Sequence, residues 1–319
     1  MRVTMIGAGY VGLVSGACFS EFGHYVSCVD RDKHKIDALR AGKIPIFEPG
    51  LPGLVERNLK AGRLEFITEL APAVAEADAI FIAVGTPSRR GDGQADLTYV
   101  LDAAREIAIN LRSGALVVTK STVPVGTGRK VARLIAEIRP ELDFDIASNP
   151  EFLREGSAVE DFLRPDRVVC GVETDRAQET IRALYQPLFL NETPVVFATL
   201  EEAELIKYAA NAFLATKVAF INEIADMCEK LDVDVQHVAR ALGMDRRIGG
   251  KFLHAGPGFG GSCFPKDTRA LAGMAHKAGA AISIVEAVIA SNQRRKKGLA
   301  ARVIGAMGGA VKEDRKSVV

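Results

Sequence analysis

The sequence predicts an α/β fold: a doubly wound parallel sheet over residues 1–198, followed by an all-helical region over residues 199–308. In the first part, short apolar runs alternate with helical patterns, an arrangement typical of a parallel sheet covered by helices on both faces. Near Thr199 the character of the chain changes: the capping pattern Thr199-x-x-Glu202 opens a long helix, and only helical patterns follow.

The apolar runs place the strands, and the periodic stretches between them place the helices. The run at residues 79–84 has no polar residue, as in a strand buried on both faces. Residues 43–50 are rich in proline and glycine and predict a loop. We expect strands at 2–6, 26–29, 64–67, 79–84, 115–119, 144–148, 167–172 and 195–197. Helices are expected at 13–22, 33–41, 51–60, 97–111, 126–138, 199–230, 234–242, 265–278 and 284–307.

A glycine motif follows the first strand. Gly7-x-Gly9-x-x-Gly12 leads directly into a helix, and the second strand ends in Asp30. This order is that of a Rossmann-like dinucleotide-binding unit, in which Gly7 makes the tight turn, Gly9 admits the pyrophosphate and Gly12 lets the helix pack on the strand. Asp30 would bind the adenosine ribose and repel a 2′-phosphate, so the predicted cofactor is NAD rather than NADP.

Cys263 stands in the glycine-rich segment Gly256–Asp267. Pro265 suits the first position of a helix, and such a helix directs its positive end at the cysteine. Lys266 adds a positive charge nearby, and both effects favour the nucleophilic thiolate. The alternative is a structural cysteine beside a flexible loop. The glycines, the proline and the lysine together favour a reactive thiol.

Lys207 and Asn211 lie four residues apart in an apolar helical stretch, so they share one face. Burying them without a partner would be costly, and a substrate hydroxyl or an oxyanion would provide one. The alternative is a lysine that extends to water.

Two carboxylates, Glu151 and Glu155, follow a predicted strand, where ligands bind in such sheets. Glu151 could activate a water, and Glu155 could contact a cofactor or a substrate hydroxyl. The alternative is a pair of solvated acids. Asp267, one helical turn beyond Cys263, would return to the side of the thiol.

A nicotinamide cofactor and a reactive cysteine together predict oxidation of an alcohol to an acid. A thiolate adds to the aldehyde left by the first hydride transfer, and the thiohemiacetal gives up a second hydride to form a thioester that water cleaves. A two-electron hydroxyacid dehydrogenase shares the fold but needs no cysteine. A non-catalytic NAD-binding module is the third possibility.

The bulk composition narrows the class of protein. A net charge of +1 over 319 residues offers no electrostatic basis for binding nucleic acid or a membrane. The five cysteines form no C-x-x-C pair and the histidines have no ligand spacing, so we expect no metal and a reducing cytoplasm. Residues 3–19 crudely resemble a signal peptide, but glycines interrupt the apolar run and it continues into the second strand. We therefore do not expect the protein to be secreted.

Taken together, these motifs resemble those of the UDP-glucose/GDP-mannose dehydrogenase family. The resemblance covers nearly the whole chain and is carried by Gly7–Gly12, Gly85–Pro87, Ser121–Thr127, Asn149–Gly156, the helix at 202–222 and Gly256–Asp267. It implies that UDP-glucose, two NAD and water give UDP-glucuronate and two NADH. GDP-mannose or an N-acetylated UDP-hexosamine is the alternative substrate.

The resemblance also implies roles for individual residues. Cys263 would be the covalent nucleophile, and Lys207 and Asn211 would stabilise negative charge on the substrate. Asp267 and Thr122 would order the water or a proton relay, and Glu151 would assist thioester hydrolysis. The implied NAD contacts are Gly7, Gly9, Val11, Gly12, Asp30, Lys35, Thr86, Thr122, Glu155 and Lys266. The implied substrate contacts are Glu151, Phe152, Leu153, Lys207, Asn211, Phe252, Leu253, His254, Ala255, Gly256 and Gly260, with Arg247 reaching into a neighbouring subunit's site.

The two longest predicted helices suggest a homodimer interface, although they would equally suit an internal bundle. Family members carry a third, UDP-binding domain, and residues 309–319 resemble the start of its first strand. We therefore expect a stub there, with NAD binding retained and UDP-sugar binding and turnover weak or absent.

Overall fold

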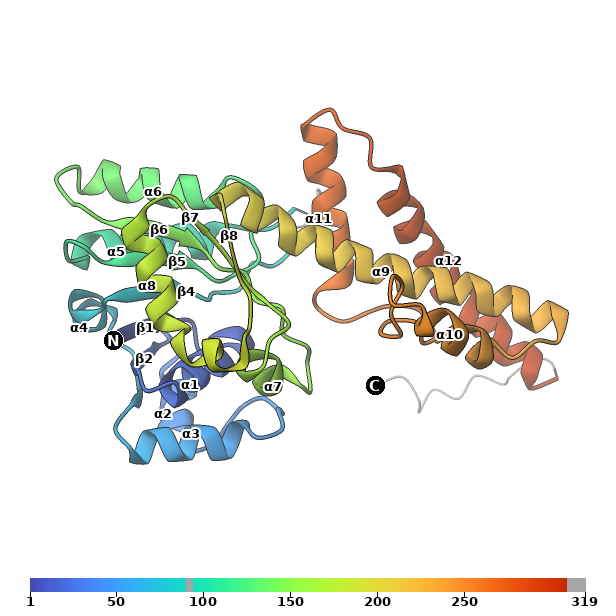
Figure 1. Ribbon diagram of the computed structural model, residues 1–319, viewed down its shortest axis with the longest axis horizontal. Helices are drawn as coiled ribbons and strands as arrows, with labels where there is room; N and C mark the ends of the chain where they lie inside the picture. The colour runs from blue at the N-terminus through green and yellow to red at the C-terminus, as the bar shows by residue number, and fades with distance from the viewer. Residues whose placement is uncertain (90–93, 309–319) are drawn as a thin grey trace. The chain divides into compact units, whose positions relative to one another are not determined.

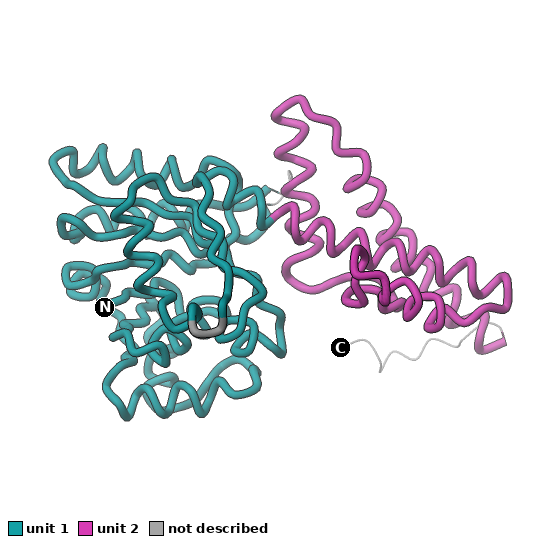
Figure 2. The backbone as a smooth tube through the Cα atoms, in the orientation of Figure 1, with its two compact units in different colours: residues 1–207 teal, residues 208–319 magenta. Residues whose placement is uncertain are grey.

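The computed structural model describes residues 1–89 and 94–308, which fall into two compact units that divide between Lys207 and Tyr208. Figure 2 colours them separately. Among the described residues no helix is both long enough and apolar enough to cross a bilayer. The predicted stub at 309–319 lies outside the described residues.

The first unit is built on one eight-stranded sheet with the order β3-β2-β1-β4-β5-β6-β7-β8 (Figure 1). Strands β1 to β6 are parallel, and the chain reverses its direction of winding between β1 and β4. This confirms the doubly wound prediction. In sheets of this kind ligands bind beyond the carboxyl ends of the strands where the winding reverses, here β1 and β4. The strands are β1 (Arg2–Ile6), β2 (Tyr25–Val29), β3 (Leu64–Ile67), β4 (Ala79–Ile82), β5 (Leu116–Thr119), β6 (Asp145–Ser148), β7 (Val168–Val172) and β8 (Val195–Ala198).

The expectation of a wholly parallel sheet is wrong at one position. Strand β7 pairs with β6 in the antiparallel sense, and β8 then pairs with β7 in parallel. The connection between β6 and β7 contains one helix of six residues, about 9 Å long, so the chain re-enters the sheet from the end at which it left. An apolar run indicates that a strand is buried, but it does not encode the strand's direction.

Helices cover both faces of the sheet and enclose two separate apolar cores. In the first core the Phe19 ring contacts those of Phe81, Phe162 and Tyr185, with centroids 5.0, 5.1 and 5.3 Å away. That face carries α1 (Tyr10–Glu21), α2 (Lys33–Arg40), α3 (Leu51–Lys60), α7 (Ala158–Leu163) and α8 (Asp175–Leu184). The other face carries α4 (Leu70–Glu76), α5 (Thr98–Asn110) and α6 (Thr127–Ile138). The short helices α4, α7, α8 and the 3₁₀ helix η1 (Gln186–Asn191) were not predicted.

The first unit extends nine residues beyond the predicted limit at residue 198, because the start of helix α9 (Leu200–Leu231) packs on the sheet domain. Leu200 is fully buried in the second core. Glu204, also buried, accepts hydrogen bonds from the backbone N–H groups of Gly126 (2.6 Å) and Gly128 (2.7 Å). Burial raises the pKa of Glu204, although these bonds oppose the rise. The carboxylate thereby ties α9 to the start of α6.

The second unit is helical throughout its described part, as predicted. It contains the rest of α9 with α10 (Val235–Met244), α11 (Phe264–Lys277) and α12 (Ser283–Ala306). Two small apolar clusters join α9, α11 and α12, one around Tyr208 and Leu271 and the other around Phe259 and Val288.

Helix α1 packs on the sheet through Gly12, which provides a test of this architecture. A Cβ atom at Gly12 would lie 1.8 Å from the backbone oxygen of Gly7, so Gly12→Ala should cost at least ~2 kcal/mol of stability. Gly53→Ala in α3 is the control: its nearest neighbour is a flexible arginine tip at 3.6 Å, and we expect a gain of up to about 1 kcal/mol. Urea unfolding followed by circular dichroism measures both, and equal stabilities would contradict this account.

Candidate active site

The glycine motif forms a turn that leaves one position open. Gly7 has φ +100°, and a Cβ there would lie 2.7 Å from the oxygen of Ala83, while Gly12 is held against Gly7. At Gly9 an added Cβ would meet nothing within 4 Å. Gly7 and Gly12 are therefore required by packing, and the open backbone at Gly9, at the start of α1, fits a pyrophosphate. Val11, in the first turn of α1, is partly buried.

Asp30 follows β2 at the same edge of the sheet. One carboxylate oxygen accepts hydrogen bonds from the backbone N–H of Ala8 (2.9 Å) and the ammonium of Lys35 (2.8 Å), and the other accepts from the N–H of Asp32 (3.0 Å). Burial alone would raise the pKa of Asp30, but these donors hold it below its ordinary value. Asp30 is thus an ionised acceptor beside the glycine turn, as an NAD ribose site requires.

The ends of β4 and β5 are joined by short hydroxyl contacts. Thr86 donates its hydroxyl to the backbone oxygen of Thr122 at 2.9 Å, and Ser121 donates to the oxygen of Val84 at 2.6 Å. The structure therefore brings Thr86 and Thr122 together at the carboxyl edge of the sheet.

Glu151 and Lys207 form a buried ion pair. The Lys207 ammonium lies 3.1 Å from one Glu151 oxygen, and the other accepts the backbone N–H of Leu153 at 2.6 Å. The Phe152 ring lies between two cations, 3.8 Å from the Arg167 guanidinium and 5.2 Å from the Lys207 ammonium. The alternative of a lysine extended to water is therefore wrong, and that of a pair of solvated acids is wrong for Glu151.

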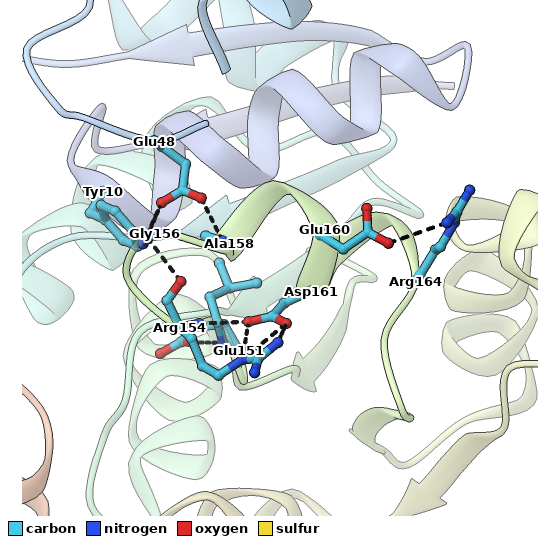
Figure 3. Close-up of polar contacts among 10 residues, drawn as sticks. Tyr10, Glu48, Glu151, Arg154, Gly156, Ala158, Glu160, Asp161 and Arg164 are labelled. Carbon is cyan, nitrogen blue, oxygen red and sulfur yellow. Dashed lines mark hydrogen bonds and ion pairs between the residues drawn. The ribbon is translucent and has the colours of Figure 1, made fainter. Parts of the chain in front are cut away.

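The loop that follows Glu151 is anchored by a buried glutamate, Glu48 (Figure 3). Its carboxylate accepts hydrogen bonds from the Tyr10 hydroxyl (2.6 Å) and from the backbone N–H groups of Gly156 (2.9 Å) and Ala158 (2.6 Å). Burial and the neighbouring Glu48 raise the pKa of Tyr10, which keeps its hydroxyl a donor.

Glu48 links the dinucleotide helix to the Glu151 loop, and it was missed in the sequence. The sequence indicated only that Glu48 lies in a loop rich in proline and glycine, which gives no sign of the segments that the carboxylate binds. Glu155, a predicted NAD contact, is exposed within the anchored loop.

In the second unit, Cys263 is the N-cap of α11, which begins at Phe264, one residue earlier than predicted. The thiol is half-buried, with its sulfur 3.5 Å from the Ser262 hydroxyl oxygen. The carbonyl of Cys263 accepts the N–H of Asp267 at 2.8 Å, which starts the helix. The predicted placement of the cysteine at a helix N-terminus is confirmed.

Asp267 is buried and binds two predicted site residues. Its two oxygens accept hydrogen bonds from the Asn211 amide and the Lys266 ammonium, each at 2.7 Å. The Lys266 ammonium, which was expected to add a positive charge near the cysteine, forms an ion pair with Asp267. Asn211, Lys266 and Asp267 therefore form one polar cluster at the first turn of α11.

The glycine-rich loop ahead of Cys263 is held by side chains of α9 and α12. Gly256 donates its N–H to Asn222 (2.8 Å), and its carbonyl accepts a hydrogen bond from Arg295. Asn292 binds both backbone groups of Phe259, accepting its N–H at 2.8 Å and donating to its oxygen at 2.9 Å. These three holding residues were not predicted.

The glycines of this loop divide into two kinds. A Cβ at Gly258 would lie 2.6 Å from the Asn292 amide oxygen, so Gly258 is needed for the loop's own packing. At Gly256, Gly260 and Gly261 nothing lies within 4 Å, so these positions leave backbone open, as predicted.

The other predicted substrate contacts differ in exposure. Phe252 has φ +65° and packs against Phe264, with the ring centroids 5.9 Å apart and the ring planes tilted by 51°, and Leu253 is buried. His254 is exposed and Ala255 half-buried. Arg247, with 89% of its side chain exposed, pairs with Asp245 at 2.6 Å. No group of three or more histidine, cysteine or acidic side chains that could hold a metal occurs in the part of the chain that the structure describes.

Comparison with known proteins assigns the family. Residues 1–189 match the NAD binding domain of the UDP-glucose/GDP-mannose dehydrogenase family, and residues 201–294 match its central domain. The chain belongs to the UDP-glucose/GDP-mannose dehydrogenase family.

Within the family, the chain is 59% identical over its whole length to the UDP-glucose 6-dehydrogenase of Rhizobium meliloti, of which it covers 74%. It is 50% identical to the UDP-glucose 6-dehydrogenase of Pseudomonas aeruginosa over 93% of its length, which is 66% of that protein. A solved UDP-glucose dehydrogenase from Pyrobaculum islandicum superposes with a TM-score of 0.91 at 43% identity, over 96% of this chain and 71% of the other.

The anchoring role of Glu48 can be tested with two glutamates shown in Figure 3. In Glu48→Gln, the side-chain NH₂ faces a backbone N–H that the carboxylate had bound, so two donors meet without an acceptor. We expect the free energy of unfolding to fall by about 1–3 kcal/mol. Glu160→Gln removes only an ion pair with Arg164 whose side chains are 64% and 75% exposed, so it should cost less than ~1 kcal/mol. Thermal unfolding measures the stability of both variants. Equal losses of stability would contradict the anchoring role of Glu48.

Proposed function

We propose that the chain oxidises UDP-glucose to UDP-glucuronate with two NAD, through a covalent intermediate on Cys263. The observation that carries the proposal is a half-buried thiol at the N-terminus of α11 in a chain that also has an open NAD turn at Gly9. The relatives named UDP-glucose 6-dehydrogenase support this substrate. Since the chain spans about two thirds to three quarters of their length, its own activity remains a proposal.

NAD held at the glycine turn would supply the hydride acceptor for each of the two oxidations. In the first, the sugar's C6 alcohol loses a hydride and a proton and becomes an aldehyde. The thiolate of Cys263 then adds to the aldehyde carbon, and the resulting thiohemiacetal loses the second hydride to give a thioester. Water cleaves the thioester, which releases the carboxylic acid and returns the thiol.

The buried polar groups have complementary tasks in these steps. Lys207 keeps N–H donors beyond its bond to Glu151 and can stabilise negative charge on the C6 oxygen. Asn211 gives one amide hydrogen to Asp267 and has a second for the same oxygen. Glu151, an acceptor on the first unit, would activate the hydrolytic water, and Asp267 with Thr122 would order the water or relay protons.

The NAD contacts are proposed to be the residues at the carboxyl edge of the sheet together with Lys266. Their support is the open turn at Gly9, the ionised Asp30 with its partner Lys35, and the joined Thr86 and Thr122. The loop at residues 252–260 is proposed to bind the sugar nucleotide. GDP-mannose or an N-acetylated UDP-hexosamine is the alternative substrate, and a GDP-mannose dehydrogenase of 35% identity shares the fold.

We further propose a homodimer formed through α9, with Arg247 entering the neighbouring site. Phe213, Phe220 and Met227 recur every seven residues and are 67%, 50% and 51% exposed, so α9 presents an apolar stripe to solvent. We place the protein in the cytoplasm, where its five free thiols would stay reduced. No partner nucleic acid or membrane is proposed.

The count of NADH per sugar tests the oxidation. Even at the slow turnover expected from the sequence, the unmodified chain should form two NADH for each UDP-glucose consumed. Cys263→Ala should lower kcat by ~10³-fold or more because the covalent route is lost. Cys228→Ala, at a buried cysteine of α9, is the matched control and should keep the unmodified rate. One NADH per sugar, or a normal rate without Cys263, would refute the proposal.

The apolar stripe tests the dimer. Phe220→Asp places a charge in the stripe and should yield a monomer in sedimentation velocity. Phe47→Asp, at a phenylalanine that is 91% exposed in the first unit, should remain dimeric. An unmodified chain that sediments as a monomer at micromolar concentration would rule out the dimer.

A further inference from the structure

A buried lysine that the proposed chemistry does not use lies at the carboxyl edge of the sheet. Lys120 directly follows β5 and precedes Ser121 and Thr122, and only 3% of it is exposed. Its backbone N–H continues the pairing with β4 by donating to Ile82 at 3.0 Å. The backbone of Lys120 is therefore held by the sheet, directly before Ser121 and Thr122 in the sequence.

The ammonium of Lys120 is directed at one amide. It donates hydrogen bonds to the side-chain oxygen of Asn149 (3.0 Å) and to the Tyr185 hydroxyl (3.3 Å), and that hydroxyl donates to the same Asn149 oxygen at 2.6 Å. The amide nitrogen of Asn149 in turn donates to the backbone oxygen of Val169 in β7 at 2.8 Å. Both polar atoms of the Asn149 side chain are thus bound, by groups from three different parts of the fold.

Asn149 begins the turn that carries Glu151. It is fully buried and is followed by Pro150, whose ring restricts the backbone before it. Two residues on, Glu151 binds Lys207 with one oxygen and the N–H of Leu153 with the other. Fixing the Asn149 side chain therefore fixes the start of the turn from which the Glu151 carboxylate extends.

Keeping the Lys120 side chain protonated inside the protein costs free energy at neutral pH. Lys207 forms a direct ion pair with Glu151. Within the described residues, 1–89 and 94–308, no carboxylate forms such a pair with Lys120. Burial lowers the pKa of Lys120 to about 8; the neighbouring Cys170 and Glu151 oppose the shift, and Lys207 adds to it.

An unfolded lysine stays protonated up to a pKa of about 10.4. Between the folded pKa of about 8 and this unfolded pKa, the unfolded chain binds more protons than the folded chain, so the free energy of unfolding rises with pH. Below about pH 8 both states are protonated, and the whole cost of burying the charge reduces stability. A residue that costs stability in this way is where a functional role is expected.

We propose that Lys120 is a positioning residue: through Asn149 it holds the turn that presents Glu151 to Lys207. Its charge also attracts the Glu151 carboxylate and repels the Lys207 ammonium, so both partners of the ion pair act on it. The kinetic consequence rests on the proposed oxidation, whereas the positioning does not. The titratable groups that act on Lys120 and Tyr185 from the surrounding elements are Cys18, Glu151, Cys170 and Lys207.

Hydrogen exchange of the peptide at residues 149–157 tests the positioning without any substrate. Lys120→Met, which keeps the chain length but loses the donor and the charge, should speed exchange in this peptide at least tenfold while the melting temperature at pH 7 stays equal or rises. Tyr185→Phe, which removes the second donor to Asn149, should give a smaller increase in the same peptide. Thr119→Val is the control, because the buried Thr119 hydroxyl has no hydrogen-bond partner among the described residues, and should change neither measurement.

Unchanged exchange at 149–157 in Lys120→Met would overturn the proposal. So would faster exchange throughout the first unit with a lower melting temperature, because that pattern indicates a general structural role.

Turnover of UDP-glucose from pH 6 to 10 tests the consequence. In the unmodified chain kcat should fall above about pH 8, as Lys120 loses its proton. In Lys120→Met, kcat at pH 7 should be at least tenfold lower, the KM for NAD should stay within twofold, and the fall above pH 8 should be absent. A kcat within twofold of the unmodified value would contradict the role of Lys120. No NADH from the unmodified chain would contradict the proposed oxidation instead, and the exchange experiment would still decide the role of Lys120.

Discussion

The candidate site depends on one constraint: a carboxylate removed from water must find donors inside the protein. Three glutamates of the first unit meet it in the same way, by accepting backbone N–H groups of loops at the carboxyl edge of the sheet. Glu48 holds Gly156 and Ala158, Glu151 holds Leu153, and Glu204 holds the start of α6. The loops that bear the proposed chemistry are thus ordered by buried charge as much as by apolar packing.

The second unit solves the complementary problem. A loop rich in glycine loses more conformational entropy on folding than other loops, so it needs strong attachments to remain in one conformation. Asn222, Asn292 and Arg295 supply them by binding the backbone at both ends of residues 256–259. The backbone at Gly260 and Gly261 stays open beyond this fixed segment, next to the thiol.

The sequence was most informative where a feature depends on neighbours along the chain. The glycine turn, Asp30 and the helix start at Cys263 are local patterns, and the structure contains each of them. Contacts between distant segments leave no such pattern. Glu48 binds an N–H 108 residues away, and Lys120 binds an amide 29 residues away. The ion pair of Lys266 with Asp267 depended on a choice of rotamer that spacing does not determine.

The distribution of the five thiols has a practical consequence for chemistry on this protein. Cys18, Cys28, Cys170 and Cys228 are buried, and burial raises the pKa of the first three, to about 12 for Cys28 and Cys170. All four are therefore shielded from water, and Cys18, Cys28 and Cys170 are protonated at neutral pH. Cys263 alone is half-buried. A fluorophore or spin label that reacts with thiols should attach at a single known position in the native chain, which provides a reporter on the loop without engineering the other four cysteines away.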